Sequence, residues 1–414
     1  MTDDVRLRRG RWSLGFSFFV QGVTFALLVT RIPAIQDQYG ISDGLLPAFL
    51  AAVPVLAGIS SVATEHLVKR IAPGVVLRWA QPLVLLALLG AGAGGQMWHV
   101  ALALGAFGLS VGALDASMNM LGVSLQRTYG RSIMLGFHAS YSLGGIVGAS
   151  AAWAGAHWHL GLFVSYLPAV VLLLPAALAA SRYYVDQGAP GADGGAGKGL
   201  GPGGFGLLLP LCLVMACAYI GDSTVSNWSA KYLQDVLGSS EQLATVPYNV
   251  YMVTTLLGRA VGDLGVRRFG PVAVVRAGTV VAAGGFAVVA AAPGAWTGML
   301  GFTLLGIGLC VIVPQTFAAA GRLAFEKFGP GASDTAVARL NIFNYVGFLI
   351  GSPLVGGIGD AWSYRGAMLV PMVLVLVTLF YARSFGVGGA RYGVGHERRA
   401  GDRVVDVGRG GNEV

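Results

Sequence analysis

Residues 105–148 read GAFGLSVGALDASMNMLGVSLQRTYGRSIMLGFHASYSLGGIVG, which is two long apolar segments joined by a basic loop at 126–132. Asp115 lies inside the first segment with Asn119 four residues later, and His138 lies inside the second. An apolar helix of roughly 20 residues is long enough to cross the hydrocarbon core of a bilayer. A carboxylate inside such a helix is energetically costly and by default marks a functional site. The stretch therefore predicts two membrane-spanning helices that carry a functional carboxylate.

The whole chain shares the apolar character of this stretch. Of its 414 residues, 55% are hydrophobic and 11% are charged, whereas about a quarter of the residues of a soluble protein are charged. The segment lengths fit no barrel of short alternating strands, so we predict an all-α membrane protein. Twelve transmembrane helices are expected, near 12–32, 45–68, 74–94, 98–125, 133–156, 160–181, 205–228, 243–262, 271–292, 296–323, 336–358 and 365–381.

Glycine-rich segments divide the chain into two halves. The run DQGAPGADGGAGKGLGPGG falls within residues 182–204, where it cannot bury a core and predicts a flexible cytoplasmic linker. The tail at 383–414 is rich in Gly and Arg and is predicted to be disordered and cytoplasmic. The expected domains are therefore a six-helix N-terminal half at 1–181 and a six-helix C-terminal half at 205–382.

The two halves carry a matching pattern in the loop after their second span. Five positions match at one constant offset of 198 residues: Glu65, Lys69, Arg70, Pro73 and Arg78 in the first half, and Asp263, Arg267, Arg268, Pro271 and Arg276 in the second. Chance aligns one or two charges, but five matches in equivalent loops indicate an internal repeat.

The placement of Lys and Arg predicts the orientation of the chain. With the N-terminus in the cytoplasm, the cytoplasmic segments carry 22 of the 27 basic residues, and the outer loops carry three. Arg259 and Arg339 lie near predicted span ends and are assigned to neither side. The net charge of +8 is thus a topology signal rather than a sign of nucleic-acid binding. Both termini are expected in the cytoplasm.

Two six-span halves in parallel repeat resemble the major facilitator superfamily of transporters. Asp263, followed by Arg267 and Arg268, resembles the cytoplasmic loop motif of that family, which implies that these residues and Glu65 of the degenerate first-half copy gate one face. Four stretches resemble the fucose-permease-like, YbjJ-like bacterial branch: TRIPAIQDQYGIS, LDASMNMLGVSLQRTYGRSIMLGFHASYSLGG, NWSAKYLQD and NYVGFLIGSPLVGGIGD. The resemblance implies a multi-pass protein of the bacterial inner membrane, and it does not extend to a substrate.

Asp115 is the residue that we expect to couple transport to protons. It lies near the middle of the fourth span, and Asn119 projects from the same helix face at i+4. The resemblance implies an acidic coupling residue in this span, so we predict that Asp115 takes up a proton outside and releases it inside. The alternative is a buried carboxylate that fixes helix packing through hydrogen bonds.

His138 and Asp222 are the other candidates for proton coupling. A histidine side chain ordinarily titrates near neutrality, so His138 could relay a proton to Asp115, or it could be a neutral histidine hydrogen-bonded in a helix interface. Asp222 could line the outer vestibule as a second ion site, or it could lie at a helix end where a carboxylate costs little. Polar side chains in the spans that line the cavity of the superfamily, and in the eleventh span, are predicted to contact substrate: Gln21, Asn119, Gln315 and Asn344.

These residues predict a secondary active transporter, a proton symporter of a small polar solute such as a sugar or related metabolite, working by alternating access. A proton-coupled exporter of amphipathic compounds is the close alternative, although the fifth span lacks the Gly-Pro motif of drug antiporters. A non-transporting receptor on the same fold would need a signalling extension, and the linker and tail are too short and polar to supply one.

An enzyme is not expected, because no P-loop, GxSxG elbow or Cys/His metal spacing is present. We predict no cofactor and no metal. The expected partners are a small-molecule substrate, protons and the lipid bilayer, with no nucleic acid, and the chain is expected to be a monomer.

Overall fold

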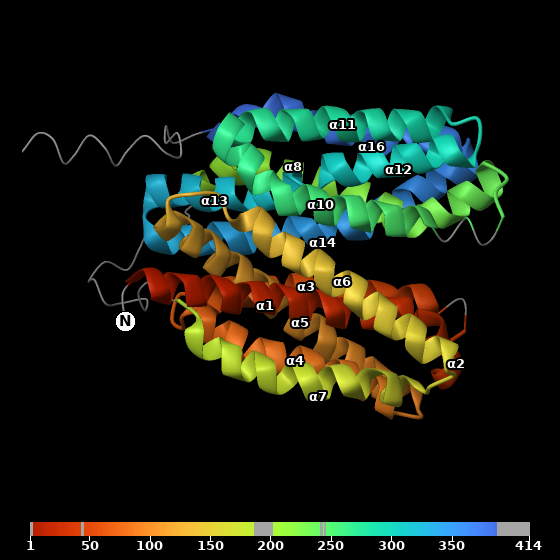
Figure 1. Cartoon of the computed structure of the whole chain (residues 1–414), viewed down its shortest axis with the longest axis horizontal. Coiled ribbons are helices and arrows are strands. Elements are labelled where there is room, and N and C mark those ends of the chain that lie inside the picture. The colour runs from red at the N-terminus through yellow and green to blue at the C-terminus, as the bar shows by residue number, and fades with distance from the viewer. Residues whose placement is uncertain (1–2, 43–44, 186–201, 241–242, 244–245, 387–414) are drawn as a thin grey trace, which may run out of the picture.

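The computed structural model describes residues 3–42, 45–185, 202–240, 243 and 246–386, and the regular elements within these ranges are all helices. The predicted all-helical class is therefore confirmed. The helices run roughly side by side in two bundles, one from the first part of the chain and one from the second (Figure 1). The predicted linker and tail fall largely outside the described residues.

The first bundle contains the helices before the linker. They are α1 (Asp3–Thr30), α2 (Ile32–Tyr39), α3 (Leu46–Leu67), α4 (Pro73–Ala93), α5 (Met97–Tyr129), α6 (Met134–His157) and α7 (Leu162–Ala180), followed by the 3₁₀ helix η1 (Ser181–Tyr183).

The second bundle contains the helices after the linker. They are α8 (Pro202–Lys231), the π-helix η2 (Tyr232–Val236), α10 (Val246–Phe269), α11 (Pro271–Ala291), α12 (Ala295–Leu309), α13 (Ile312–Phe328), α14 (Pro330–Ala361), α15 (Tyr364–Ala367), α16 (Leu369–Tyr381) and the 3₁₀ helix η3 (Ala382–Gly386). The helical chain continues past the predicted boundary at 382 because Phe385 is fully buried and its carbonyl accepts a hydrogen bond from Arg322 at 2.7 Å.

Nine helical segments in the described ranges are long and apolar enough to cross a membrane. They are α1, α4, α5, α7, α8, α11, the α12–α13 pair, α14 and the α15–α16 pair. The helices α3, α6 and α10 lie at the three remaining predicted positions and pack against the other helices of the bundles. Nine predicted spans are thus supported, and the count of twelve stays a prediction.

The tenth predicted span is not one continuous helix. α12 and α13 are separated by a turn at Cys310 and Val311. Pro314 explains this break, because a proline has no N–H to donate to the carbonyl four residues earlier, which is that of Cys310. The predicted span near 296–323 is supported as one membrane-spanning segment, but it carries a break that the sequence analysis did not predict, and the Cys310 carbonyl is left open to a partner from another helix.

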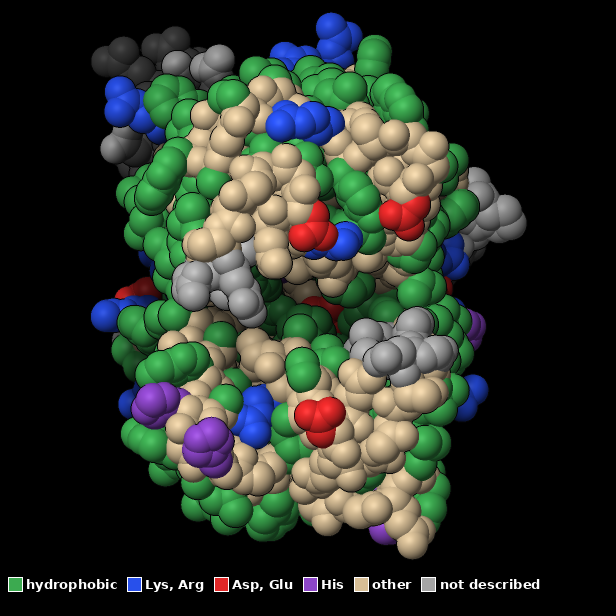
Figure 2. Space-filling model, turned by 90° about the vertical axis from the view of Figure 1, so that its right-hand side faces the viewer, with side chains coloured by type: hydrophobic (Ala, Val, Ile, Leu, Met, Phe, Trp, Pro, Cys, Tyr) green, Lys and Arg blue, Asp and Glu red, His purple; other side chains and the backbone are tan. Residues whose placement is uncertain are grey.

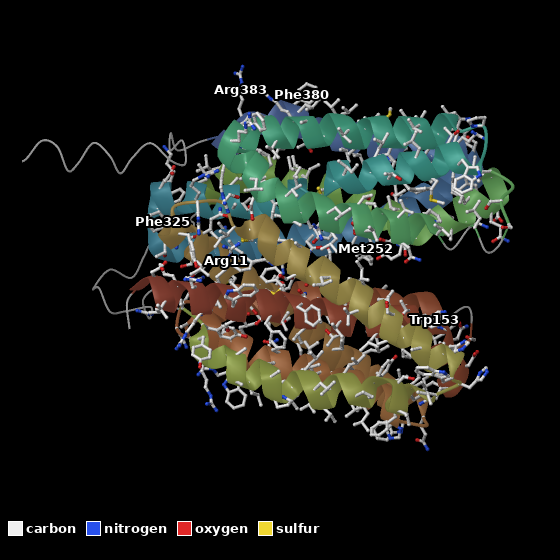
Figure 3. All side chains as sticks on the ribbon, in the orientation of Figure 1. Arg11, Trp153, Met252, Phe325, Phe380 and Arg383 are labelled. Carbon is white, nitrogen blue, oxygen red and sulfur yellow. The ribbon has the colours of Figure 1, made fainter. Side chains whose placement is uncertain are left out.

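The bundles have two distinct ends. The start of α1, the end of α7 and the end of α16 lie at one end, which we name the linker face, and we name the other end the opposite face (Figure 1). Figure 3 shows Arg11 and Phe325 near the linker face and Trp153 near the opposite face.

The interface between the bundles is built from a few helix pairs. α3 packs on α14, α6 packs on α10, and α5 contacts both α13 and α14. Figure 2 looks onto the opposite face and shows a hollow between the two bundles, with hydrophobic walls and an acidic side chain in its depth. The bundles are therefore apart at the opposite face.

Glycine lets α1 and α6 cross in close contact inside the first bundle. A Cβ atom at Gly144 of α6 would overlap the backbone carbonyl oxygen of Phe19 in α1. Small residues permit this kind of approach between membrane helices. The next residue, Gly145, faces α10 instead, where a Cβ would lie 3.6 Å from Cε of Met252 (Figure 3).

Candidate functional site

Asp115 lies in the interior of α5 at the interface between the bundles, where it is 9% exposed. Its Oδ1 accepts hydrogen bonds from Gln21 Nε2 of α1 at 3.2 Å and from Asn119 Nδ2 at 3.4 Å. Its Oδ2 accepts from Asn344 Nδ2 at 3.3 Å and from the Tyr345 hydroxyl at 3.0 Å, both on α14. We name these five residues the Asp115 cluster. The carboxylate is shared between the two bundles.

The Asp115 cluster has unused hydrogen-bonding capacity. Gln21 Oε1 and Asn119 Oδ1 are buried and have no partner among the described residues. An unsatisfied buried polar atom costs about 1–3 kcal/mol, so two such atoms beside a carboxylate indicate a place where a ligand or water binds. Asn341 extends the cluster, since its Oδ1 accepts from Asn344 and its Nδ2 donates to Ser61 of α3. The cluster can therefore bind the hydroxyl groups of a polar solute.

Asp222 is a second acid within the second bundle. It is half-buried in the interior of α8, and its Oδ1 accepts a hydrogen bond from the Tyr251 hydroxyl of α10. Asp115 and Asp222 both act electrostatically on Tyr141 and Tyr219. The two acids consequently share one central region of the molecule.

Arg259 of α10 reaches the same region from the second bundle. Its Nη1 donates to Ser142 Oγ of α6 at 2.7 Å, across the interface between the bundles. Its Nε donates at 3.4 Å to the carbonyl of Cys310, which is the carbonyl that Pro314 leaves free. The break between α12 and α13 thus helps to fix the position of this guanidinium.

His138 and Gln315 lie apart from the hydrogen bonds of Asp115. His138 is buried between Phe18 and Phe317, with ring centroids 5.3 and 6.2 Å from its own. No hydrogen bond joins His138 to Asp115, so the predicted proton relay has no direct contact in this conformation. His138 Nε2 and Gln315 Nε2 are buried and have no partner in the described part of the chain.

One ion pair joins the two bundles at the linker face. Arg339 Nε of α14 lies 3.1 Å from Glu65 Oε1 of α3, and the two side chains are 25% and 7% exposed. Glu65 was predicted as a gating residue, and its partner Arg339 was not. A second contact between the bundles at this face is the hydrogen bond of 2.6 Å from Arg127 Nη1 to Ser333 Oγ.

The other predicted gating residues lie on α10 and meet the loop between α5 and α6. Asp263 accepts hydrogen bonds from Ser132 Oγ at 2.5 Å and from the Gly136 backbone N–H at 2.9 Å. Arg267 Nη2 donates to the Ser132 carbonyl at 2.7 Å. Arg268 lies instead over the ring of Phe269 at 5.2 Å, and this contact is within one bundle. Asp263 and Arg267 of the second bundle therefore contact the first bundle at the linker face. Arg268 makes no such contact within the described residues.

The structure brings together four residues that were predicted separately, Asp115, Gln21, Asn119 and Asn344. Residues outside the predicted set also bridge the bundles, and two of them, Arg259 and Arg339, carry a charge there. Both are basic residues that the sequence places near span ends, and that position gave no reason to assign them. In the described residues, no group of three or more His, Cys, Asp or Glu side chains is placed to hold a metal ion.

Comparisons with known proteins agree with this architecture. Residues 211–387 match the family model of the Major Facilitator Superfamily. An uncharacterised MFS-type transporter of Yersinia pestis is 27% identical over 380 residues, which cover 90% of this chain and 94% of that protein. The membrane protein MosC of Rhizobium meliloti is 23% identical over 381 residues, or 90% of each chain.

Solved structures share the fold. FucP, a Major Facilitator Superfamily transporter in the outward conformation, superposes with a TM-score of 0.75 at 16% identity and covers 91% of this chain and 98% of its own. The human organic anion transporter MFSD10 has a TM-score of 0.74 at 13% identity, covering 91% and 99%. Identities this low show the fold alone.

Proposed function

We propose that the chain is a transporter of the major facilitator superfamily, as its family-model match, relatives and fold support, and that it is a proton-coupled symporter of a small polar solute that works by alternating access. A sugar or a related hydroxylated metabolite is the proposed class of solute. FucP, which shares the fold, is itself described as a fucose:proton symporter.

The observation that carries this proposal is the position of the Asp115 carboxylate between the bundles. As an ion it accepts hydrogen bonds from Gln21 on one side and from Asn344 and Tyr345 on the other. A protonated carboxyl group becomes a donor and loses part of its acceptor capacity. Protonation of Asp115 therefore weakens bonds that join the bundles, and this links proton uptake to their relative movement.

The two faces of the molecule support alternating access. Ionic and hydrogen-bonded contacts join the bundles at the linker face, whereas the opposite face has a hollow between them (Figure 2). We propose that the linker face is cytoplasmic, as the distribution of basic residues predicts. In this orientation the conformation is open to the outside.

Proton movement during transport tests this function directly. The purified protein is reconstituted in liposomes that enclose a pH-sensitive dye, and a panel of sugars and related solutes is added outside at lower pH. Addition of a transported solute is expected to acidify the liposome interior above the rate in protein-free liposomes. Uptake of a solute with no accompanying proton movement would contradict symport.

Glu65→Gln is expected to loosen the linker face, because it removes the charge that pairs with Arg339 across the interface. A partly exposed pair of this kind contributes about 1 kcal/mol, which corresponds to a shift of roughly fivefold in a conformational equilibrium. Spin labels at the exposed positions Lys69 and Glu326, one in each bundle, report the population in which this face is open. The three native cysteines are replaced beforehand.

Asp235→Asn is the matched control for this variant. It breaks the exposed ion pair of Lys231 with Asp235, which joins neighbouring turns of one chain segment and not the two bundles. The distance distribution at the linker face should not change in this control. An unchanged distribution in Glu65→Gln as well would show that the ion pair with Arg339 does not gate this face.

A further inference from the structure

Arg259 lies deep between the bundles and not at either face. It is ten residues before the end of α10 at Phe269, which is about 15 Å along a helix with a rise of 1.5 Å per residue. Its side chain points across the interface to Ser142 of α6. A guanidinium at this depth is too far from the linker face to reach bulk water there.

No carboxylate forms an ion pair with Arg259 within the described residues. The two ion pairs there lie at the faces of the molecule and do not include it. Its own partners, the Ser142 hydroxyl and the Cys310 carbonyl, are uncharged. Asp222 acts on it electrostatically but without an ion pair, and its Oδ1 is occupied by the Tyr251 hydroxyl. Arg259 is part-buried, and a charge at this depth without an ion-pair partner is costly, which indicates that an anion binds here during the transport cycle.

The guanidinium has the donors that such an anion needs. Arg carries five N–H groups, and the contacts with Ser142 and Cys310 use two of them. The remaining N–H groups form part of a planar fork that suits carboxylate and phosphate oxygens. His138 Nε2 and Gln315 Nε2 are also buried and lack partners among the described residues. His138 is on α6, which packs against α10, and Gln315 is on α13, which begins after the break at Cys310 and Val311.

We propose that Arg259 is the anion-binding residue of the central site, so that the transported solute is a hydroxylated compound carrying an oxyanion, either a carboxylate or a phosphate ester. The inference rests on the proposed function, since it names the class of solute for the same site. The hydroxyl groups of the solute bind the Asp115 cluster from one side, and its anionic group binds Arg259 from the other.

Binding of matched probes to the purified protein tests the proposal. The probes are D-glucuronate and D-glucose 6-phosphate, with neutral D-glucose as the uncharged reference, and affinity is measured by ligand-dependent thermal stabilisation in detergent. At least one anion is expected to bind about 10- to 100-fold more tightly than glucose, as hydrogen bonds to a charged group imply. Which of the two anions binds then identifies the oxyanion.

Arg259→Gln is expected to abolish the preference for the anion, and Arg259→Lys, which keeps the charge but not the fork, to retain part of it. Arg276→Gln, at an exposed position of α11, is the matched control and should bind as the unmodified protein does. Each variant is compared with its own stability without ligand, so a loss of stability in Arg259→Gln does not obscure the result.

The outcomes separate this inference from proton coupling. Equal affinity for glucose and both anions, no binding of either anion, or an anion preference that persists in Arg259→Gln would each overturn the assignment. Equilibrium binding requires no pH gradient, so anion binding that depends on Arg259 would stand even if solute uptake proved independent of protons.

Discussion

Asp115→Asn is expected to abolish accumulation of the solute driven by a pH gradient. The amide has nearly the size of the carboxylate but cannot take up a proton. With one proton per solute, a gradient of one pH unit supports about tenfold accumulation, and the variant should reach a ratio of about one. Uptake of the radiolabelled solute into liposomes, with and without a pH gradient, measures both ratios.

Asp360→Asn is the control for this experiment, because Asp360 is an exposed acid at the end of α14 whose carboxylate accepts from Tyr364. It should accumulate the solute as the unmodified protein does. Solute exchange without a gradient should persist in Asp115→Asn, which shows that the variant is folded. Full dependence on the pH gradient in Asp115→Asn would remove the assignment and direct the search to Asp222.

Gly144→Ala should destabilise the folded protein by about 3 kcal/mol, at the upper end of the range for overpacked sites. The added Cβ would overlap the carbonyl oxygen of Phe19, and a backbone atom cannot move aside as a flexible side chain can. α1 and α6 would have to separate along their crossing. The fraction of monodisperse protein after heating in detergent, followed by size-exclusion chromatography, measures this loss.

Gly145→Ala provides a control one residue away on the same helix. Its Cβ would make an ordinary contact of 3.6 Å with Met252 Cε, at the end of a flexible side chain. Alanine also favours the helix relative to glycine, so this variant should be at least as stable as the unmodified protein. Equal thermal stability of the two variants would show that the crossing of α1 and α6 adjusts to a methyl group.

The fold was largely predictable because long apolar segments have few alternatives in a membrane. Backbone groups in lipid must be satisfied internally, so such segments become helices. The break at Cys310 was not predicted, because hydropathy continues unchanged across Pro314 and only the missing N–H interrupts the helix. The resemblance to the superfamily was predicted from repeated loop residues such as Asp263, and the family model that matches residues 211–387 agrees with it, whereas the bacterial branch stays a prediction.

The candidate site was predictable only where one residue carries the signal. Asp115 was identified because a carboxylate in an apolar span is costly. Its hydrogen-bond partners Gln21 and Asn344 are 94 and 229 residues away, and no local pattern shows which polar side chains meet across that distance. Arg259 was placed near a span end because the predicted span stopped at 262, while α10 continues to Phe269.

The shared carboxylate of Asp115 also has a consequence for the energy supply of the cell. A channel-like path for protons would discharge the electrochemical gradient that every other carrier in the same membrane uses. Here the group proposed to accept the proton is bonded to α1 and to α14 at once. On the proposed mechanism, a proton bound by Asp115 is released on the other side only after both bundles rearrange. Such a carrier would leak protons no faster than it turns over without solute.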